Sequence, residues 1–547
     1  MRILNRRIGL LFGVFLCLLV CAIGRAAWLA SVKASDLKSR ALSQQVADID
    51  VAAARGSITD RHGLDLAVSE DAVTVFANPF LIKNPAAVAA RLAPLIGVPQ
   101  PDVLQKISDP RKGFVYLKRK LSGPNGSKVE KLKIEGIGTM VEPKRTYPQG
   151  ALASQLIGTV GTDNIGLSGV EQLLDQRLHG SDGKRRIVRD ALGDPVSIVD
   201  MKRAEPGRDV KLTLDATLQE RVEAVLADVG STYRPRGATA LVMDPRSGAL
   251  LALANWPRVD ANDIGGAPPY ARQNRAVAAA YEPGSTFKAI TVSGALQERL
   301  VTPTTEFDIP PQIQVADRTI KDAELHGYER LTVARILAQS SNIGAVKIGL
   351  QLGKTRFDRW VRGFGFGKST GVDLPGESPG IVLKPENYSG SSMGNLPIGQ
   401  GIAVTPIQMA QAYSAIANGG VMRRPYVVQG GQKPGKRVLA PGVAGQVAKM
   451  LEGVLAAGGT ASEAAIPGYT LAGKTGTAQK PDPINGGYSK FNYVASFIGF
   501  APARNPRLLV AVMVDEPQGA IYGGVVAAPA FQKILSFALP YLRIPPG

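Results

Sequence analysis

A run of apolar residues near the N-terminus constrains the fold of this chain more than any other feature. Residues 8–28 are apolar or small except for Arg25, and about 20 such residues can cross a bilayer as a helix. Three arginines precede the run: Arg2, Arg6 and Arg7. Because basic residues favour the cytoplasmic side, we expect residues 1–7 to be a cytoplasmic tail and residues 8–28 a single-pass transmembrane anchor in the inner (plasma) membrane. The rest of the chain would then be periplasmic or extracytoplasmic.

A cleaved signal peptide is the main alternative for this segment, because Val20-Cys21-Ala22 loosely resembles a small-residue cleavage site. The apolar run continues past that point to Trp28, an aromatic residue suited to the membrane interface, and this favours an uncleaved anchor. A buried core helix is the third interpretation.

Composition excludes several classes of function. The chain has 547 residues, of which 45% are hydrophobic, so it can bury more than one core. Lys and Arg outnumber Asp and Glu by 64 to 45, which predicts an anionic partner surface. Aromatic content is only 6%, which argues against nucleic acid as that partner. Both cysteines, Cys17 and Cys21, lie in the apolar run and there are three histidines, so we expect no disulfide, metal site or cofactor beyond it.

The pattern of residues 29–207 predicts a strand-rich N-terminal domain. The segment RGSITDRHGLDLAVS (55–69) is typical of two strands around a turn at His62–Gly63. Its charged residues are interpreted as an internal charge network rather than as catalytic groups: Arg55, Asp60 and Arg61. Residues 111–145 contain ten Lys or Arg and three Asp or Glu. One interpretation is a surface that binds lipid headgroups or an anionic polymer. The other is a face that is only solvated.

A second domain is expected at residues 208–547. EPGRDV (205–210) is a turn-rich joint, and a strand and a helix are predicted directly after it. Further strands are predicted in residues 238–256, around an Asp-Pro-Arg-Ser-Gly turn, and in residues 508–517. Helical spacing occurs between them, at 286–296, 333–339, 343–352 and 407–416. This order predicts an α+β fold with a sheet assembled from distant segments and a helical insertion beside it.

The first of three short motifs surrounds Ser285. Pro283-Gly284 precedes this serine, and the helical spacing after it places Lys288 one turn further along the same face. A lysine can take the serine proton only if burial or nearby positive charge lowers the lysine pKa. Backbone N–H groups at the helix start can stabilise negative charge. Alone, however, this motif favours simple helix capping by Ser285.

The second motif is SSN, from Ser340 to Asn342, between two helical stretches. Its first and third residues can project to one side, so that the hydroxyl can relay a proton and the amide can hold a substrate carbonyl. Alone, this motif is typical of a helix cap.

The third motif is GKTGTAQ (473–479), which predicts a strand edge to which an extended ligand can add, since Gly476 allows close approach. Lys474 supplies positive charge, and Thr475 and Thr477 can hydrogen-bond a carboxylate. The backbone N–H groups of Thr477 and Ser285 can form an oxyanion hole.

A phosphate-binding loop is the rival interpretation of this motif, because Gly468 completes a GxxxxGKT pattern. A phosphate loop needs a helix directly after it. The strand-like YTLA before Gly473 and the proline after GTAQK argue against that helix.

The three motifs follow the order Ser-x-x-Lys, Ser-x-Asn and Lys-Thr-Gly, which is typical of penicillin-binding proteins and serine β-lactamases. The chain resembles a class B penicillin-binding protein over almost its whole length, and EPGSTFK, SSN and KTGTA resemble the division-type (FtsI-like) branch more than the elongation branch. Further segments that carry the resemblance are RGSITDRHGLDLA (55–67), RTYPQGALASQLIGTVG (145–161), GLSGVEQLLDQRLHG (166–180), LPIGQGIAVTPIQMAQAYSAIANGG (396–420) and YGGVVAAPAF (522–531).

The resemblance implies a dimerisation-like pedestal domain at 29–207 and a transpeptidase domain at 208–547, with an antiparallel sheet flanked by helices and a helical subdomain. It implies a D,D-transpeptidase that cross-links peptidoglycan stem peptides in septal wall synthesis and is a target of β-lactams. A septal glycosyltransferase and other division proteins would be its partners. The implied catalytic residues are Ser285 as nucleophile, Lys288 as its base, and Ser340 and Lys474 as proton relays. The implied substrate-binding residues are Asn342, Thr475, Gly476 and Thr477.

Three other functions fit the same pattern less well. An elongation-type transpeptidase shares the motifs, although its second motif tends to carry an Asp. A β-lactamase or β-lactam sensor shares the fold, but a class A lactamase needs a glutamate that activates the deacylating water. The glutamates between the second and third motifs are not in an ExxLN setting: Glu377, Glu386, Glu452 and Glu463. A scaffold protein with a degenerate domain is disfavoured by the intact motifs.

Overall fold

The computed structural model describes residues 2–33, 46–189 and 195–546, and its contacts divide the chain into two compact units. The first unit consists of Met1–Ala54, Asp71–Pro143 and Gly180–Gly207. The second unit consists of Arg55–Glu70, Lys144–His179 and Arg208–Gly547. Two segments that precede residue 207 therefore pack with the C-terminal part of the chain.

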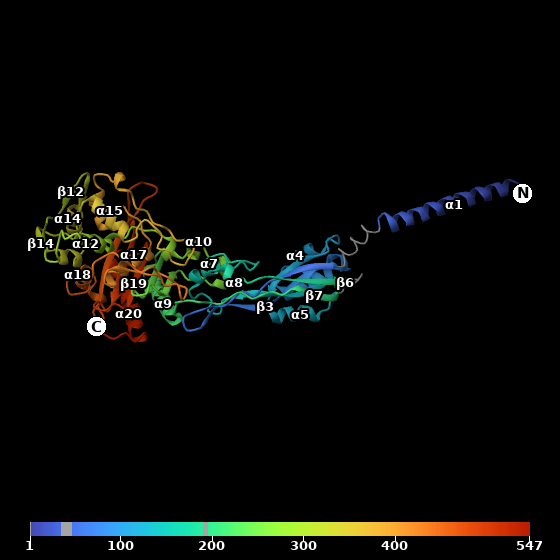
Figure 1. The fold of residues 1–547 in the computed structure, drawn as a ribbon, viewed down its shortest axis with the longest axis horizontal. Coiled ribbons are helices and arrows are strands. Elements are labelled where there is room, and N and C mark those ends of the chain that lie inside the picture. The colour runs from blue at the N-terminus through green and yellow to red at the C-terminus, as the bar shows by residue number, and fades with distance from the viewer. Residues whose placement is uncertain (1, 34–45, 190–194, 547) are drawn as a thin grey trace. The chain divides into compact units, whose positions relative to one another are not determined.

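The predicted N-terminal helix is present as α1, which spans Arg2–Ser31 (Figure 1). Its segment Arg7–Ser31 is long and apolar enough to cross a membrane, and none of its most apolar window is buried against the rest of the protein. A soluble core helix would bury such a surface, so the core-helix interpretation is disfavoured.

Apart from α1, the described part of the first unit contains two sheets and three α-helices. One antiparallel sheet has the order β1-β6-β7, with β1 (Val46–Val51), β6 (Gly183–Arg189) and β7 (Pro195–Lys202). In the other, β3 (Asp65–Ala77) pairs with β4 (Val115–Leu121) and β5 (Ile137–Thr146). The helices are α3 (Pro85–Ile96), α4 (Gln100–Ile107) and α5 (Gly123–Lys131).

These three helices were not predicted from the sequence, which indicated strands and turns. Helix α3 begins after Asn84, whose side chain accepts a hydrogen bond from the N–H of Ala87, and Asn is a favoured N-cap residue. Its buried residues Leu92 and Ile96 are four apart and join the core of this unit. The capping residue and this spacing are the signals that would have revealed it.

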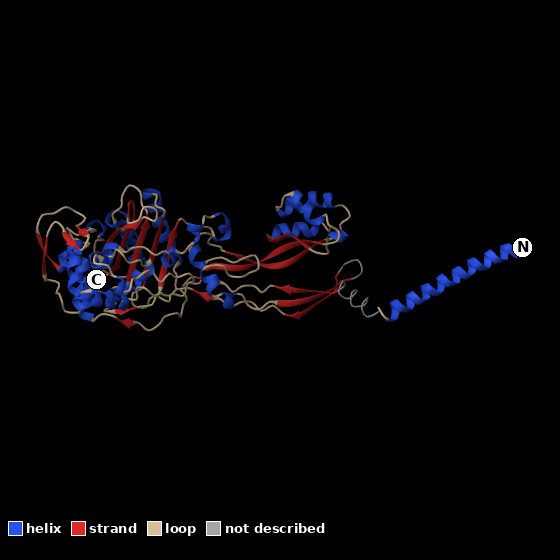
Figure 2. Ribbon diagram, turned by 90° about the horizontal axis from the view of Figure 1, so that it is seen from above, coloured by secondary structure: helices blue, strands red, loops and turns tan. Residues whose placement is uncertain are grey.

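A five-stranded antiparallel sheet is the centre of the second unit, with the order β10-β9-β19-β18-β17. Its strands are β9 (Gly237–Met243), β10 (Leu250–Trp256), β17 (Ala472–Pro481), β18 (Tyr488–Ala501) and β19 (Leu508–Asp515). Along β9, Ala240 and Val242 join one hydrophobic core, while Leu241 and Met243 join the other. The sheet thus separates two cores, as alternation of side chains requires, and Figure 2 shows its strands among helices.

Helices cover both faces of this sheet. Helices α9 (Ala216–Tyr233) and α20 (Ala528–Tyr541) pack on one face, and α11 (Arg275–Ala278) and α17 (Pro406–Ala417) on the other. Helix α12 (Lys288–Gln297) packs against a helical subdomain of α13 (Val333–Ala338), α14 (Asn342–Leu352), α15 (Lys354–Gly363) and α18 (Pro441–Glu452). Two hairpins precede α13, formed by β11 (Glu306–Ile309) with β14 (Glu329–Thr332) and by β12 (Ile313–Val315) with β13 (Arg318–Ile320). Strands and helices are present in the predicted segments of this domain, except that the strand after the joint covers only Val210–Lys211 and the helix expected from residue 286 begins at Lys288.

The segments 55–70 and 144–179 bring a buried charge network into the second unit. The Arg55 guanidinium donates to the Glu171 carboxylate at 2.8 Å and to Asp175 at 2.6 Å, and Arg145 donates to Glu171 at 2.5 Å. The side chains of Arg55 and Glu171 are fully buried. The predicted internal network is therefore confirmed for Arg55.

The two other charged residues assigned to that network lie outside it. The Asp60 carboxylate accepts hydrogen bonds from the backbone N–H groups of His62, Leu64 and Ala216. Arg61 is exposed and lines a surface cavity. Asp60 follows the short strand β2 (Ile58–Thr59), which pairs with β3 across the predicted turn. Its position in this turn makes a backbone cap its nearest partner.

Candidate active site

The segment with Ser285 is a short 3₁₀ turn rather than the start of an α-helix. The turn η3 covers Gly284–Phe287, and α12 begins at Lys288, whose N–H donates to the carbonyl oxygen of Ser285. Gly284 adopts a φ of 55°, a conformation that favours glycine. The Tyr413 hydroxyl donates to the carbonyl oxygen of Thr286 at 2.7 Å. These contacts fix the backbone at Ser285.

Lys288 is fully buried directly after this turn. Its Nζ donates to the carbonyl oxygen of Ser340 at 2.5 Å, to the Ser340 hydroxyl at 3.2 Å and to Oδ1 of Asn342 at 2.7 Å. Burial lowers the pKa of Lys288 to about 7, although the negative charge of Asp322 acts in the opposite direction. A lysine in this environment is partly neutral at neutral pH.

The Ser285 hydroxyl makes no hydrogen bond with another residue in the described part of the chain, and Lys288 Nζ is engaged by the SSN segment instead. The structure thus has no hydrogen bond between the side chains of Ser285 and Lys288. Catalytic hydrogen bonds often form only in the substrate complex. A hydroxyl with no competing partner is free to meet a substrate.

The SSN segment owes its shape to an unusual backbone at Ser340. This residue has a φ of 63°, in the left-handed region, and it separates α13 from α14. Ser341 caps α14 by accepting a hydrogen bond from the N–H of Gly344 at 3.0 Å. The middle residue of the motif therefore caps the helix, and the outer two, Ser340 and Asn342, both contact Lys288.

Strand β17 runs beside the Ser285 turn. A Cβ atom added at Gly476 would lie 2.9 Å from Cγ2 of Thr286 and 3.0 Å from the carbonyl oxygen of Pro283. A Cβ atom at Gly284 would lie 3.1 Å from the carbonyl oxygen of Thr477. The KTG segment therefore contacts the turn that carries Ser285.

The fully buried Lys474 is held on this strand. Its Nζ donates to the hydroxyl of Thr475 at 3.2 Å. Burial, assisted by the nearby charge of Lys288, lowers the pKa of Lys474 well below its usual range. Because two adjacent ammonium groups repel each other, the pair favours states in which at least one amine is neutral.

The threonines of the third motif have partners that the sequence did not reveal. The Thr475 hydroxyl lies 2.8 Å from that of Thr460, and the Thr477 hydroxyl accepts a hydrogen bond from the N–H of Gly523 at 3.0 Å. Strand β17 continues to Pro481. No helix follows the glycine of the motif, so the phosphate-loop interpretation is wrong.

We expect Gly476→Ala to slow acylation of Ser285, the nucleophile that the resemblance implies, because its Cβ would collide with the Ser285 turn and with Oγ of Ser496. Overpacking of this kind costs about 1–3 kcal/mol. The free energy of unfolding and the rate of labelling by a fluorescent penicillin are the measurements. Gly445→Ala in α18, where nothing lies within 4 Å of the new Cβ, is the matched control: it should leave the labelling rate unchanged and raise the free energy of unfolding by about 0.5–1 kcal/mol, because Ala favours a helix over Gly. Equal behaviour of the two variants would contradict the close approach of β17.

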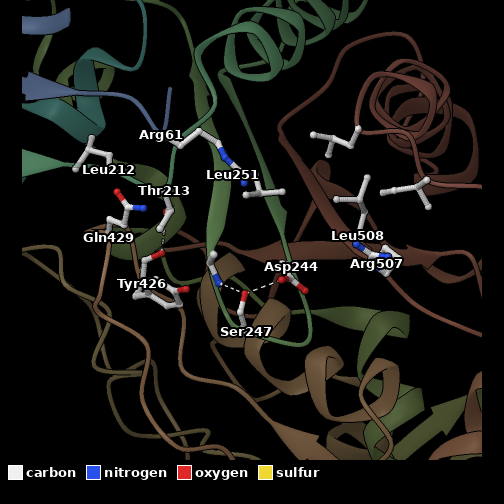
Figure 3. A pocket seen from close by; sticks show the side chains of 13 residues that line it. Arg61, Leu212, Thr213, Asp244, Ser247, Leu251, Tyr426, Gln429, Arg507 and Leu508 are labelled. Atoms are coloured by element: carbon white, nitrogen blue, oxygen red, sulfur yellow. Dashed lines mark hydrogen bonds between the residues drawn. The ribbon is translucent and has the colours of Figure 1, made fainter. Parts of the chain in front are cut away.

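Of two cavities in the described part of the second unit that bear on the site, the larger does not lie at the motifs. It has a volume of about 380 Å³ and adjoins the turn between β9 and β10, where the Ser247 hydroxyl donates to Asp244 at 2.7 Å (Figure 3). None of its lining residues belongs to the three motifs. The smaller cavity, of about 310 Å³, is lined by Glu282, Ala478 and Lys480 among others. It therefore flanks both the Ser285 turn and β17.

Comparison with known proteins agrees with this geometry. Residues 238–536 match the family model of the penicillin-binding protein transpeptidase domain, and residues 50–212 match that of the penicillin-binding protein dimerisation domain. The chain is 32% identical to the peptidoglycan D,D-transpeptidase FtsI of Escherichia coli K12, over 99% of this chain and 92% of FtsI. It is 34% identical to the stage V sporulation protein D of Bacillus subtilis, over 98% of this chain and 85% of that protein.

A solved structure extends the similarity to the fold. The penicillin-binding protein 3 of Mycobacterium tuberculosis, in complex with aztreonam, superposes with a TM-score of 0.71 at 30% identity, over 91% of this chain and 98% of that chain. The chain belongs to the penicillin-binding protein family. Within it, the pairing of a dimerisation and a transpeptidase domain and the similarity to FtsI make it a class B member of the FtsI-like division type.

Proposed function

We propose that this chain is a serine-type D,D-transpeptidase that cross-links peptidoglycan stem peptides during septal wall synthesis. The observation that carries this proposal is the buried amine of Lys288, which lies one turn after Ser285, contacts the SSN motif and has a pKa of about 7. A buried neutral lysine is a suitable base for a serine nucleophile at neutral pH. FtsI, which is similar to this chain over nearly all of its length, is a peptidoglycan D,D-transpeptidase.

In the acylation step, neutral Lys288 accepts the proton of the Ser285 hydroxyl. The Ser285 Oγ then attacks the carbonyl carbon between the last two D-alanines of a donor stem peptide. The C–N bond breaks, and the nitrogen of the terminal D-alanine takes a proton as it leaves. An amine of a neighbouring stem peptide attacks the resulting ester, which forms the cross-link and returns the proton to Ser285.

The remaining motif residues have supporting roles in this scheme. Ser340 and Lys474 relay protons, a role supported by the contact of Ser340 with Lys288 and by the lowered pKa of Lys474. Asn342 holds the peptide. The substrate would add along β17, where Thr475 and Thr477 bind its terminal carboxylate and Gly476 leaves room for its backbone. The N–H groups of Ser285 and Thr477 would form the oxyanion hole.

Membrane topology and partners are part of the same proposal. Helix α1 would anchor the chain in the membrane lipid with the N-terminus in the cytoplasm, since three arginines precede it. The dimerisation-like pedestal at residues 29–207 would dock a septal glycosyltransferase and other division proteins, and residues 208–547 would catalyse cross-linking. The matches of the two family models to 50–212 and 238–536 support this division.

Labelled penicillin tests the proposal directly. We expect the intact chain to form a covalent adduct on the peptide that contains Ser285, and Ser285→Ala to form none. Mass spectrometry of the same sample, expressed with its N-terminal segment, should find that segment uncleaved. An adduct that persists in Ser285→Ala, or no adduct on the wild-type chain, would disprove the assignment of the nucleophile.

The lifetime of the adduct separates the transpeptidase from a β-lactamase of the same fold. A wall enzyme should remain acylated long after free penicillin is removed, because it has no efficient route for water to attack the ester. Rapid release of hydrolysed penicillin would favour the β-lactamase.

A further inference from the structure

A carboxylate outside the three motifs contacts the SSN segment from its far side. Asp322 follows β13, and its side chain is only 11% exposed. Its Oδ1 accepts the backbone N–H groups of Asn342 and Ile343, the latter at 3.0 Å. Its Oδ2 accepts the hydroxyl of Ser341 at 2.7 Å. The Asp322 carboxylate therefore accepts hydrogen bonds from the first two backbone N–H groups of α14, and it also holds the middle serine of the motif.

The same loop also orients the Asn342 amide. Nδ2 of Asn342 donates to the carbonyl oxygen of Lys321 at 2.8 Å. Because the NH₂ group is held by this carbonyl, Oδ1 is left to face Nζ of Lys288, which it contacts at 2.7 Å. The loop thus determines which atom of the amide meets the lysine.

His326 completes the surroundings of Asp322. Its Nε2 lies 3.1 Å from Oδ2 of Asp322, and its Nδ1 lies 2.7 Å from the carbonyl oxygen of Gly327. His326 therefore adds a hydrogen-bonded neighbour to the carboxylate of Asp322.

The charge of Asp322 reaches Lys288 as well. Two charged groups face the Lys288 amine: Asp322, whose negative charge raises the pKa of the amine, and Lys474 on β17, with which the amine interacts repulsively. The other partners of Nζ, Ser340 and Asn342, are neutral. Burial is the larger influence on the pKa of Lys288, and the charge of Asp322 opposes it.

We propose that Asp322 is a positioning residue of the transpeptidase reaction, which fixes the Ser341 hydroxyl and the backbone of Asn342 and so holds the SSN segment against Lys288. This inference rests on the proposed function. It assigns to the loop between β13 and β14 a role in the geometry of the active site, although Asp322 itself does not touch the substrate.

Asp322→Asn tests the inference, since it keeps the shape of the side chain but removes its charge and turns an NH₂ group toward donors. We expect the second-order rate constant of acylation by labelled penicillin to fall by about 10- to 100-fold, the range for a lost charged hydrogen bond. The acid limb of the rate against pH should also move to lower pH, because loss of a nearby negative charge lowers the pKa of Lys288. A purely structural defect would lower the rate without that shift.

Glu324→Gln changes an exposed carboxylate of the same loop and is the matched control. It should behave as wild type.

The outcomes separate this inference from the proposed function. A wild-type chain that is not acylated on Ser285 would overturn the function itself. Normal acylation of the wild type together with an unchanged rate and pH profile of Asp322→Asn would overturn the positioning role alone. If Asp322→Asn does not fold, His326→Ala decides: loss of one donor to Asp322 should slow acylation by about two- to tenfold, and a wild-type rate in that variant would contradict the inference.

Discussion

The Lys288→Met variant should be acylated by labelled penicillin about 100- to 10,000-fold more slowly than the wild type, the range that a positioned general base supplies. Methionine is unbranched and apolar, so it fills the buried space of the lysine. It cannot accept the proton of Ser285, and it also removes the donor that contacts Ser340 and Asn342. Stopped-flow measurement of the acylation rate, with the melting temperature as a check on folding, tests this expectation.

The wild-type pH profile belongs to the same prediction. Because burial lowers the pKa of Lys288 to about 7, the fraction of neutral amine falls about tenfold for each pH unit below that value. The acylation rate should therefore rise with pH up to about 7 and level off above it. Lys347→Met in α14 is the control, since this lysine donates to the carbonyl oxygen of Asp308 and not to the motifs. A Lys288→Met rate within tenfold of the wild type would show that another group is the base.

The second large effect is on stability. Glu171→Ala should lower the free energy of unfolding of the second unit by about 3–5 kcal/mol, because it leaves the buried guanidinium groups of Arg55 and Arg145 without their shared carboxylate. Chemical denaturation followed by fluorescence measures this change. The exposed pair of Glu220 with Arg258 is the contrast, since Glu220→Ala should cost less than about 1 kcal/mol. Similar losses in the two variants would mean that burial does not set the strength of the network.

Much of the second unit could be predicted because its elements have strong local patterns. The alternating apolar residues around the Asp-Pro-Arg-Ser-Gly turn form β9 and β10, and the apolar run at 508–517 forms β19. The three motifs also indicated the candidate site, since their spacing on a helix, a turn and a strand limits where each side chain can point. Lys288, Asn342 and Lys474 are accordingly buried or held close to the Ser285 turn.

What could not be predicted depends on contacts between distant segments. Asp322 lies 20 residues before Asn342 in a loop of ordinary polar composition, and only the folded chain places it under α14. The pairing of Thr475 with Thr460 and of Thr477 with Gly523 is equally non-local. The left-handed backbone of Ser340 has no sequence signal either, because serine rarely adopts that conformation. Helix α3 of the first unit, by contrast, had a local signal in its N-cap residue, Asn84.

The strand order of the central sheet has a consequence for biosynthesis. Strand β9 pairs with β19, which is more than 260 residues later in the chain, and β18 lies between β19 and the strand with the KTG motif. A ribosome-bound chain that lacks β19 cannot join the two halves of this sheet. Catalytic competence should consequently arise only after β19 has been synthesised, so that a shorter nascent chain is inert.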